Sequence, residues 1–224
     1  MATRVKFHQS LDDLKEKLLI MAGMAEQAIQ RSIEAYRTRD LSICELVFRS
    51  EPAINRLERE IDQMALDLLA MEQPMAIDLR FILAVIKING DLERIGYQSM
   101  GIARRTKDMI DMEPVALPVD FEAMGEYAGR MIRSALQALL DGDARVADTV
   151  REMDDEIDRM NRRAHSDLLR MIEEKPQYTR QAMNGILVAK SLERIADHAA
   201  AIATDVIFWI RGADVRHLLT MKAE

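Results

Sequence analysis

Two pairs of carboxylates in the second half of the chain have the spacing of a chelating site. Asp154 and Asp158 form one pair, and Glu193 and Asp197 form the other. Because side chains four residues apart on a helix share one face, each pair could hold a cation from one helix. Four carboxylates at one level repel unless they are exposed, protonated or bound to a cation, and hard oxygen ligands suit Mg²⁺, Mn²⁺, Ca²⁺ or iron. The sequence therefore predicts a metal site, and an ordinary charged face neutralised by arginines is the alternative.

The two pairs come together if their helices form a hairpin. A break near Pro176 separates the helices, and a short connection favours antiparallel neighbours. Residues whose numbers sum to about 351 then lie level in the hairpin. Asp154 is expected opposite Asp197, and Asp158 opposite Glu193.

The first half of the chain repeats this pattern less completely. The same arithmetic around a turn near Pro74 puts Glu51 level with Tyr97 and Asn55 level with Glu93. Tyr97 and Asn55 replace two of the four carboxylates, so this is the weaker predicted site. Its candidate ligands, including two acids further along the same stripe, are Glu51, Asn55, Glu93, Glu58 and Asp62.

Two histidines lie beside the acids of the second half. They are His165, which occupies the position that Asp62 has in the first half, and His198. A lone helical histidine is more often a surface or hydrogen-bonded residue than a metal ligand. Neither is assigned as a ligand.

Six helices are expected to position these side chains. Apolar residues recur at spacings of three and four, as in the stripe from Val188 to Val206, and no alternating segments predict strands. Ser10 and Asp13 resemble a capping box at the start of the first helix. The predicted helices cover about 11–38, Asp40 to Pro74, about 76–110, Asp120 to Asp141, Asp143 to about 173, and the break at 174–178 to Gly212.

The chain contains an internal repeat. DLERIGYQSMGIAR begins at residue 91 and SLERIADHAAAIAT at residue 191, and the two segments share six of fourteen positions. Duplication explains this agreement better than chance does. The segment from Met112 to Asp120 has two prolines and no helical period, which is typical of a linker. We expect an all-α protein of two tandem, pseudo-symmetric three-helix bundles, with units at 1–111 and 120–224 and a linker at 112–119.

Composition excludes several classes of protein. A formal net charge of −7 disfavours binding to duplex nucleic acid, which requires a concentrated basic face. The single cysteine, Cys44, permits no intrachain disulfide and suits a reducing cytoplasm. No apolar run approaches the ~18 residues that a membrane-spanning helix needs, and residues 1–10 lack the apolar core of a signal peptide.

Catalytic motifs give little support for an enzyme. The sequence has no GxxxxGK phosphate loop, no GxSxG elbow and no CxxC pair. A carboxylate-bridged metal oxidase or storage bundle is the best enzymatic rival, but such bundles normally use Glu-x-x-His, which does not occur in this sequence. A helical scaffold or adaptor with solvated acids and no metal remains the stronger alternative.

Several segments together resemble one family. They are MAGMAEQAI (21–29), QPMAIDLRFI (73–82), the twice-used LERI, and LERIADHAAAIATDVIFWIRGADVRH (192–217). With these segments and their repeat order, nearly the whole chain resembles the PhoU family of phosphate-transport regulators. The resemblance implies two three-helix bundles with repeated Glu/Asp-x-x-x-Asp motifs capable of holding iron, zinc or other metal clusters. The motif is intact at Asp154/Asp158, Glu193/Asp197 and Glu58/Asp62, and fails at Glu93, where Tyr97 replaces the final Asp.

The resemblance also implies a role. Family members are non-enzymatic negative regulators of phosphate uptake and of the phosphate-starvation response. They link the ATPase subunit of the phosphate ABC transporter to its sensor histidine kinase. We therefore expect a cytoplasmic regulator, peripheral at the inner membrane through its partners and homodimeric.

Overall fold

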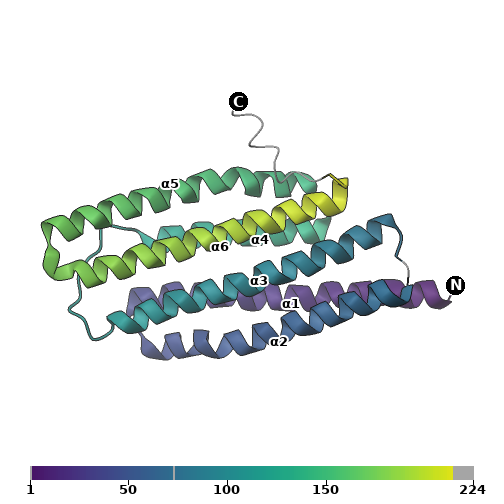
Figure 1. The fold of residues 1–224 in the computed structure, drawn as a ribbon, viewed down its shortest axis with the longest axis horizontal. Coiled ribbons are helices and arrows are strands. Elements are labelled where there is room, and N and C mark those ends of the chain that lie inside the picture. The colour runs from purple at the N-terminus through teal and green to yellow at the C-terminus, as the bar shows by residue number, and fades with distance from the viewer. Residues whose placement is uncertain (1, 73, 214–224) are drawn as a thin grey trace.

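The structure, a computed structural model, is a bundle of long helices. It describes residues 2–72 and 74–213, and residues 214–224 of the predicted second unit lie outside the described residues. No strand occurs in this described part, which confirms the all-α prediction. The helices are α1 (Ala2–Thr38), α2 (Leu41–Glu72), α3 (Ala76–Met109), α4 (Phe121–Asp141), α5 (Ala144–Glu174) and α6 (Thr179–Arg211), with a short 3₁₀ turn, η1 (Pro176–Tyr178), before α6 (Figure 1).

Most predicted helix ends are correct and have local causes. The carboxylate of Asp40 accepts the backbone N–H of Ser42 at 2.7 Å, and that of Asp120 accepts the N–H of Ala123 at 2.9 Å. Each acid thus satisfies a donor that the first helical turn leaves without a partner. Gly142 and Gly212 follow α4 and α6 with φ of 62° and 68°, a left-handed conformation that glycine adopts most easily.

The predicted start of the first helix is wrong. α1 begins at Ala2, so Ser10 lies inside the helix, where its hydroxyl donates to the Lys6 carbonyl at 3.1 Å. The apolar stripe extends back to Phe7, which is buried. Packing of these additional turns against the core outweighs the local capping signal.

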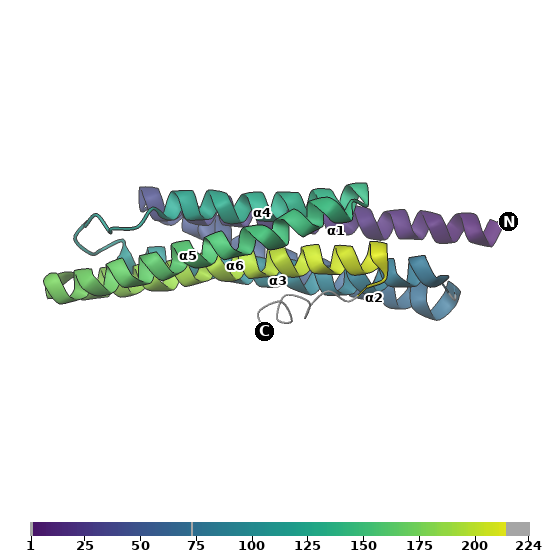
Figure 2. The same ribbon diagram turned by 90° about the horizontal axis from the view of Figure 1, so that it is seen from above.

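The helices form two layers. Figure 1 shows α5, α6, α3 and α2 one below another, and each contacts the next, so they form one layer. Figure 2 shows α4 and α1 on one side of this layer. α1 packs on α2 and α3, and α4 packs on α5 and α6, which gives one three-helix unit in each half. The halves meet where α3 contacts α6 and α1 contacts α4. The third helix of each repeat is therefore central to the layer.

One hydrophobic core runs through both halves. Leu18 and Ile88 from the first half belong to the same buried cluster as Ile132, Ile195 and Val206 from the second. Residues 110–120 connect α3 to α4 without a helix and are attached at two points. The Arg39 guanidinium donates to the Met112 carbonyl at 3.0 Å, and the Gln181 amide donates to the Glu113 carbonyl at 3.3 Å. The boundaries 1–111, 112–119 and 120–224 remain our proposal for the domains.

Candidate metal centre

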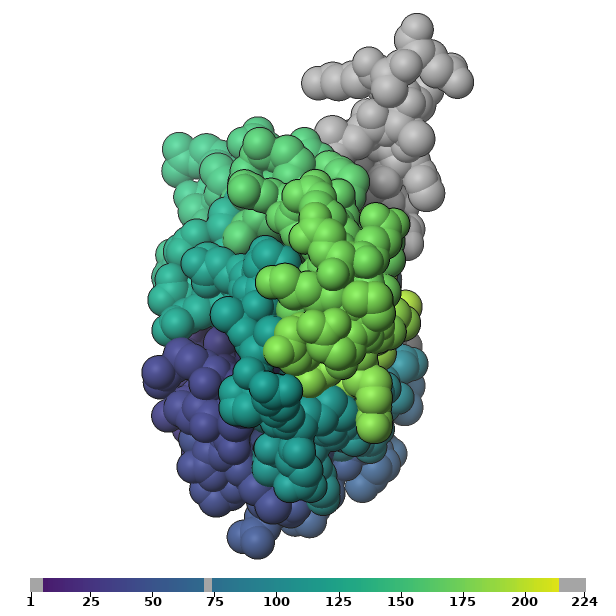
Figure 3. All heavy atoms as spheres, turned by 90° about the vertical axis from the view of Figure 1, so that its left-hand side faces the viewer, coloured from purple at the N-terminus to yellow at the C-terminus, as the bar shows by residue number. Residues whose placement is uncertain are grey.

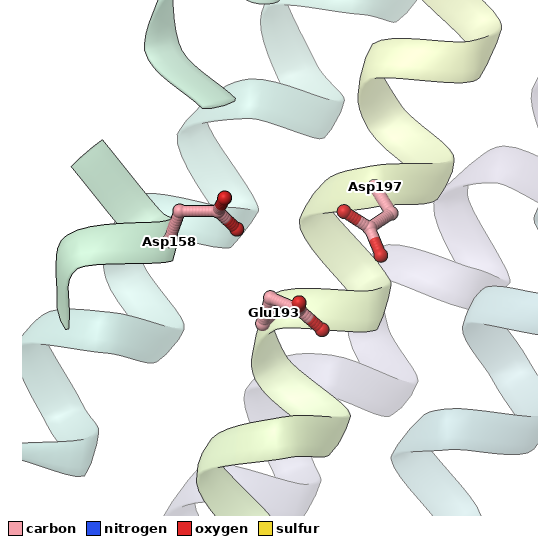
Figure 4. Close-up of side chains that lie close together, drawn as sticks. All are labelled: Asp158, Glu193 and Asp197. Carbon is pink, nitrogen blue, oxygen red and sulfur yellow. The ribbon is translucent and has the colours of Figure 1, made fainter. Parts of the chain in front are cut away.

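The α5–α6 hairpin brings three of the predicted ligands together. Asp158 on α5 faces Glu193 and Asp197, which lie one turn apart on α6 (Figure 4). One carboxylate oxygen from each residue lies within 4.8 Å of the others. A single cation placed among these oxygens could contact all three. The geometry agrees with the hairpin register expected from the sequence.

Asp154 lies one turn before Asp158 in α5, outside this group of three. Burial raises the pKa of its carboxyl, and the charges of Asp158, Asp155 and Glu193 raise it further. Its Oδ1 atom is buried and has no hydrogen-bond partner among the described residues. A buried carboxylate oxygen without a partner is costly, so Asp154 would gain from a cation in the centre.

Among the acids of the cluster, Asp197 has the most strongly raised pKa. Burial is the largest cause that raises the pKa of its carboxyl to about 6, followed by the charges of Glu193 and Asp154. Lys190 opposes this rise. The cluster therefore binds a proton more readily than isolated carboxylates do, as expected for like charges held together without enough counter-charge.

Lys190 is a functional neighbour that sequence reasoning missed. Its ammonium lies 2.6 Å from both carboxylate oxygens of Glu193, which is buried. The spacing of three residues on a helix could have signalled this pair. Gly90 occupies the matching position of the first repeat, so only the second half has this internal cation. Arg162 also lies 3.5 Å from Asp158, so basic residues neutralise part of the centre.

The first half does not gather its candidate ligands in the same way. The amide of Asn55 donates to Glu51 at 2.8 Å, and Glu93 pairs with Arg94 at 3.6 Å. Tyr97, in place of a carboxylate, is exposed. Within residues 2–72 and 74–213, Asp158, Glu193 and Asp197 are the one group of three or more potential metal-ligating side chains.

Glu58 and Asp62 form a separate polar group on α2. Burial raises the pKa of Glu58, and the charges of Glu93 and Asp62 add to the effect. Asn89 on α3 is fully buried and donates to the Asp62 carboxylate at 2.9 Å. This part of the first half therefore has its own hydrogen-bond network, in which Asp62 already has a partner.

Some acids of each half line one groove along the contact between α3 and α6, although Asp158, Glu193 and Asp197 do not. Glu58, Glu93 and Asp154 line this cavity of about 760 Å³. His198 lies in its wall, where Nδ1 is 2.9 Å from the Asp91 carboxylate of the other half. His198 therefore links α3 to α6 and is not one of the three residues of the carboxylate group. The pseudo-symmetric repeat places the two acidic faces beside each other.

The fold and this site define a duplicated helical-bundle protein with a carboxylate-rich face. A family model described as the PhoU domain matches residues 18–106 and again residues 121–206. The chain is also 35% identical over 222 residues to the phosphate-specific transport system accessory protein PhoU homolog of Pseudomonas aeruginosa, covering 98% of this chain and 92% of that one. The chain belongs to the PhoU family.

Solved structures support the same conclusion. The crystal structure of PhoU from Pseudomonas aeruginosa matches with a TM-score of 0.89 at 34% identity, covering 92% of this chain and 100% of that one. The phosphate transport system regulatory protein PhoU from Streptococcus pneumoniae matches with a TM-score of 0.87 over 93% of this chain and 99% of that one. At 22% identity, the second likeness shows the fold alone.

Proposed function

We propose that this protein is an accessory protein of a phosphate-specific transport system and acts without catalysing a reaction. The observation that carries the proposal is the 35% identity to a protein of that name, which covers 98% of this chain. The fold supports it because the pseudo-symmetric helices present long, continuous side faces. Such faces suit protein contacts better than they suit substrate enclosure.

The finer role we propose is negative regulation. In phosphate-replete cells the protein would couple the transporter ATPase subunit to the sensor histidine kinase and repress the starvation response. Exposed apolar residues at equivalent points of the two repeats support contacts with partners: Leu83 on α3 is 38% exposed, and Met183 on α6 is 48% exposed. None of the described helices is long and apolar enough to cross a membrane. We propose a cytoplasmic protein, homodimeric and held at the inner membrane by these partners.

We further propose that the second half binds a metal ion through Asp158, Glu193 and Asp197, with Asp154 nearby. The donor chemistry fits a hard ion, because the group offers carboxylate oxygens and neither sulfur nor imidazole. Magnesium, manganese and iron therefore fit better than zinc. The partnerless Oδ1 of Asp154 supports the same assignment. Bound metal would neutralise the carboxylates and hold α5 against α6.

Deletion of the gene tests the regulatory role. Alkaline phosphatase activity in high phosphate should rise on deletion and return to the repressed level when the gene is restored. Two matched variants each add one negative charge. Leu83→Glu places it on the proposed contact face, and Gln137→Glu places it at an exposed position of α4. Only Leu83→Glu should fail to restore repression. Unchanged repression after deletion would contradict the regulatory proposal.

Elemental analysis of the purified protein tests the metal site. The wild type should contain a stoichiometric metal, and the double variant Asp158→Ala/Glu193→Ala should lose it. Asp148→Ala/Glu152→Ala removes two acids from the start of the same helix and should retain the metal. Metal-free wild type, or equal content in both double variants, would support the helical scaffold without metal. A content of many ions per chain would favour the storage bundle.

A further inference from the structure

A second cavity lies at the end of the molecule where the two repeats are connected. Figure 3 faces this end, and the teal part of the chain lies there between the blue helices of the first half and the green helices of the second. The cavity has a volume of about 190 Å³ and lies beneath residues 112–119. Drug-sized ligands occupy cavities of roughly 300–1,000 Å³, so this one suits a smaller molecule.

The polar side chains around this cavity are rich in hydrogen-bond donors. Tyr36, Arg37 and Arg39 come from the last turn of α1 and the residue after it, and Thr106 and Gln181 come from α3 and α6. None of the described residues that line the cavity has a carboxylate side chain. The remaining walls are apolar and include Leu117 and Phe121, so a charge inside would interact with the donors more strongly than in water.

The hydrogen-bond donors that the first half contributes to this cavity have few partners in the described part of the chain. Arg37 and the Tyr36 hydroxyl have no hydrogen-bond partner among the residues that the structure describes, and the Arg39 guanidinium has only the Met112 carbonyl. Burial raises the pKa of the Tyr36 hydroxyl, against the opposing charge of Arg39, so this group remains a donor at neutral pH. Arg37 is exposed, whereas Tyr36 and Arg39 are partly buried. Two guanidinium groups and a phenol therefore line one small space that none of the described carboxylates lines.

The backbone of Arg39 adds an independent observation. Its φ of 54° makes it the one non-glycine residue with positive φ in the described part of the chain. The left-handed conformation costs a non-glycine residue free energy, and such strain often persists where a side chain has a function. A glycine would follow α1 more easily but would leave the cavity without a guanidinium.

We propose that this cavity binds a small oxyanion. The two guanidinium groups would form charge-assisted hydrogen bonds with its oxygens, and the Tyr36 hydroxyl would donate a further one. Because Gln181 of α6 and the connecting segment also line the cavity, the anion would bind both repeats at once. The site is separate from the three-carboxylate centre and does not depend on the proposed metal.

Calorimetric titration of the full-length, EDTA-treated protein with inorganic phosphate tests the proposal. Sulfate and acetate serve as comparison ligands, at constant ionic strength set with chloride. We expect saturable binding of one oxyanion per chain. Each of Tyr36→Phe, Arg37→Ala and Arg39→Gly should weaken it by about tenfold or more, as expected for a lost hydrogen bond to a charged group.

The variants separate binding from folding. Arg39→Gly relieves the backbone and Tyr36→Phe retains the ring that packs edge-on against Phe121, so both should fold. Arg163→Ala removes an exposed arginine of α5 and should bind like the wild type, as should Asp158→Ala/Glu193→Ala. Absence of saturable binding at millimolar concentrations, or an affinity equal to that of the wild type in all three cavity variants, would overturn the proposal.

Discussion

Single side chains set the charge balance of the metal centre. Lys190 already provides a positive charge to Glu193, 2.6 Å from each of its carboxylate oxygens. A metal ion must therefore compete with an ammonium that belongs to the protein. An ammonium and a metal ion on the same carboxylate repel each other, so Lys190 lowers the affinity of Glu193 for a metal ion.

Replacement of Lys190 should consequently strengthen metal binding. In Lys190→Gln we expect Mn²⁺ affinity to rise by about tenfold, corresponding to about 1.4 kcal/mol, because the internal competitor is lost. Metal-free Lys190→Gln should also melt at a lower temperature than the wild type, and added Mn²⁺ should reverse the loss. Titration calorimetry and thermal melting measure the two effects. Lys107→Gln, which removes an exposed lysine of α3, is the control. Weaker Mn²⁺ binding by Lys190→Gln would show that the lysine supports the centre instead of competing.

The carboxyl of Asp197 should make stability depend on pH. Its folded-state pKa of about 6 exceeds the ordinary value of 3.8, so the folded state binds this proton more tightly than the unfolded state does. The free energy of unfolding of the metal-free protein should therefore fall as pH rises from about 4 to about 6. The raised pKa values of Asp154 and Glu58 act in the same direction.

The variant Asp197→Asn tests this dependence. It should be more stable than the metal-free wild type at pH 7.5, and the difference should vanish near pH 4, where the wild-type carboxyl is protonated. Urea unfolding across this pH range, in EDTA, measures the change. Asp141→Asn, at the exposed end of α4, should follow the wild-type curve. A stability that falls between pH 4 and pH 6 by the same amount in Asp197→Asn and wild type would exclude the carboxyl of Asp197 as the cause of the fall.

At the scale of the helices, close packing decides which glycines can be replaced. A Cβ atom at Gly185 of α6 would lie 2.9 Å from Leu117, 3.2 Å from Leu168 and 3.3 Å from Phe121. A Cβ atom at Gly23 of α1 would meet no other atom within 4 Å. The same residue type therefore serves packing in one helix and only costs helix stability in the other.

The matched substitutions should have opposite effects. Gly23→Ala should stabilise the protein by about 0.4–1 kcal/mol, because alanine has less freedom in the unfolded chain and a better helix propensity. Gly185→Ala should destabilise it by about 1–3 kcal/mol, since three neighbours must move. Urea denaturation of both variants gives the two values. An increase in stability for Gly185→Ala would mean that the connecting segment moves aside at little cost.

At the scale of the whole molecule, the two repeats depend on each other. The Arg80 guanidinium of α3 donates to the Trp209 carbonyl of α6 at 3.0 Å, and Phe81 packs edge-on against the Trp209 ring. Lys87 and Asp205 form an ion pair at 2.9 Å across the same contact. Together with the shared core, these contacts bury surfaces that either half alone would expose to water.

Separately produced halves should therefore associate. Chains 1–111 and 120–224 should each aggregate or form molten species alone, and should form a one-to-one complex when they are refolded together. Light scattering after size-exclusion chromatography measures the masses. Phe81→Asp places a charge in the contact between α3 and α6 and should prevent formation of the complex. Leu66→Asp changes an exposed residue of α2 and should leave the complex intact. Two stable, separate monomers would show that each repeat has a sufficient core of its own.

The sequence by itself determined the helices, the repeat and the approximate register of the ligands. The stripe from Val188 to Val206 and the caps at Asp40, Asp120 and Gly142 are local signals, because helix periodicity and capping depend on neighbouring residues. Pro74 interrupts the chain as predicted, whereas Pro52 lies inside α2 without ending it. Burial of Ile54 and Ile61 beyond it favours continuation of the helix.

Only the tertiary structure decided how these elements face one another. It left Asp154 outside the group of Asp158, Glu193 and Asp197, and it placed Lys190 against Glu193. It also brought the end of α1, the connecting segment and Gln181 around one cavity. The physical reason is that helical spacing fixes a side chain's direction around its own axis, but packing among six helices fixes which neighbour it meets.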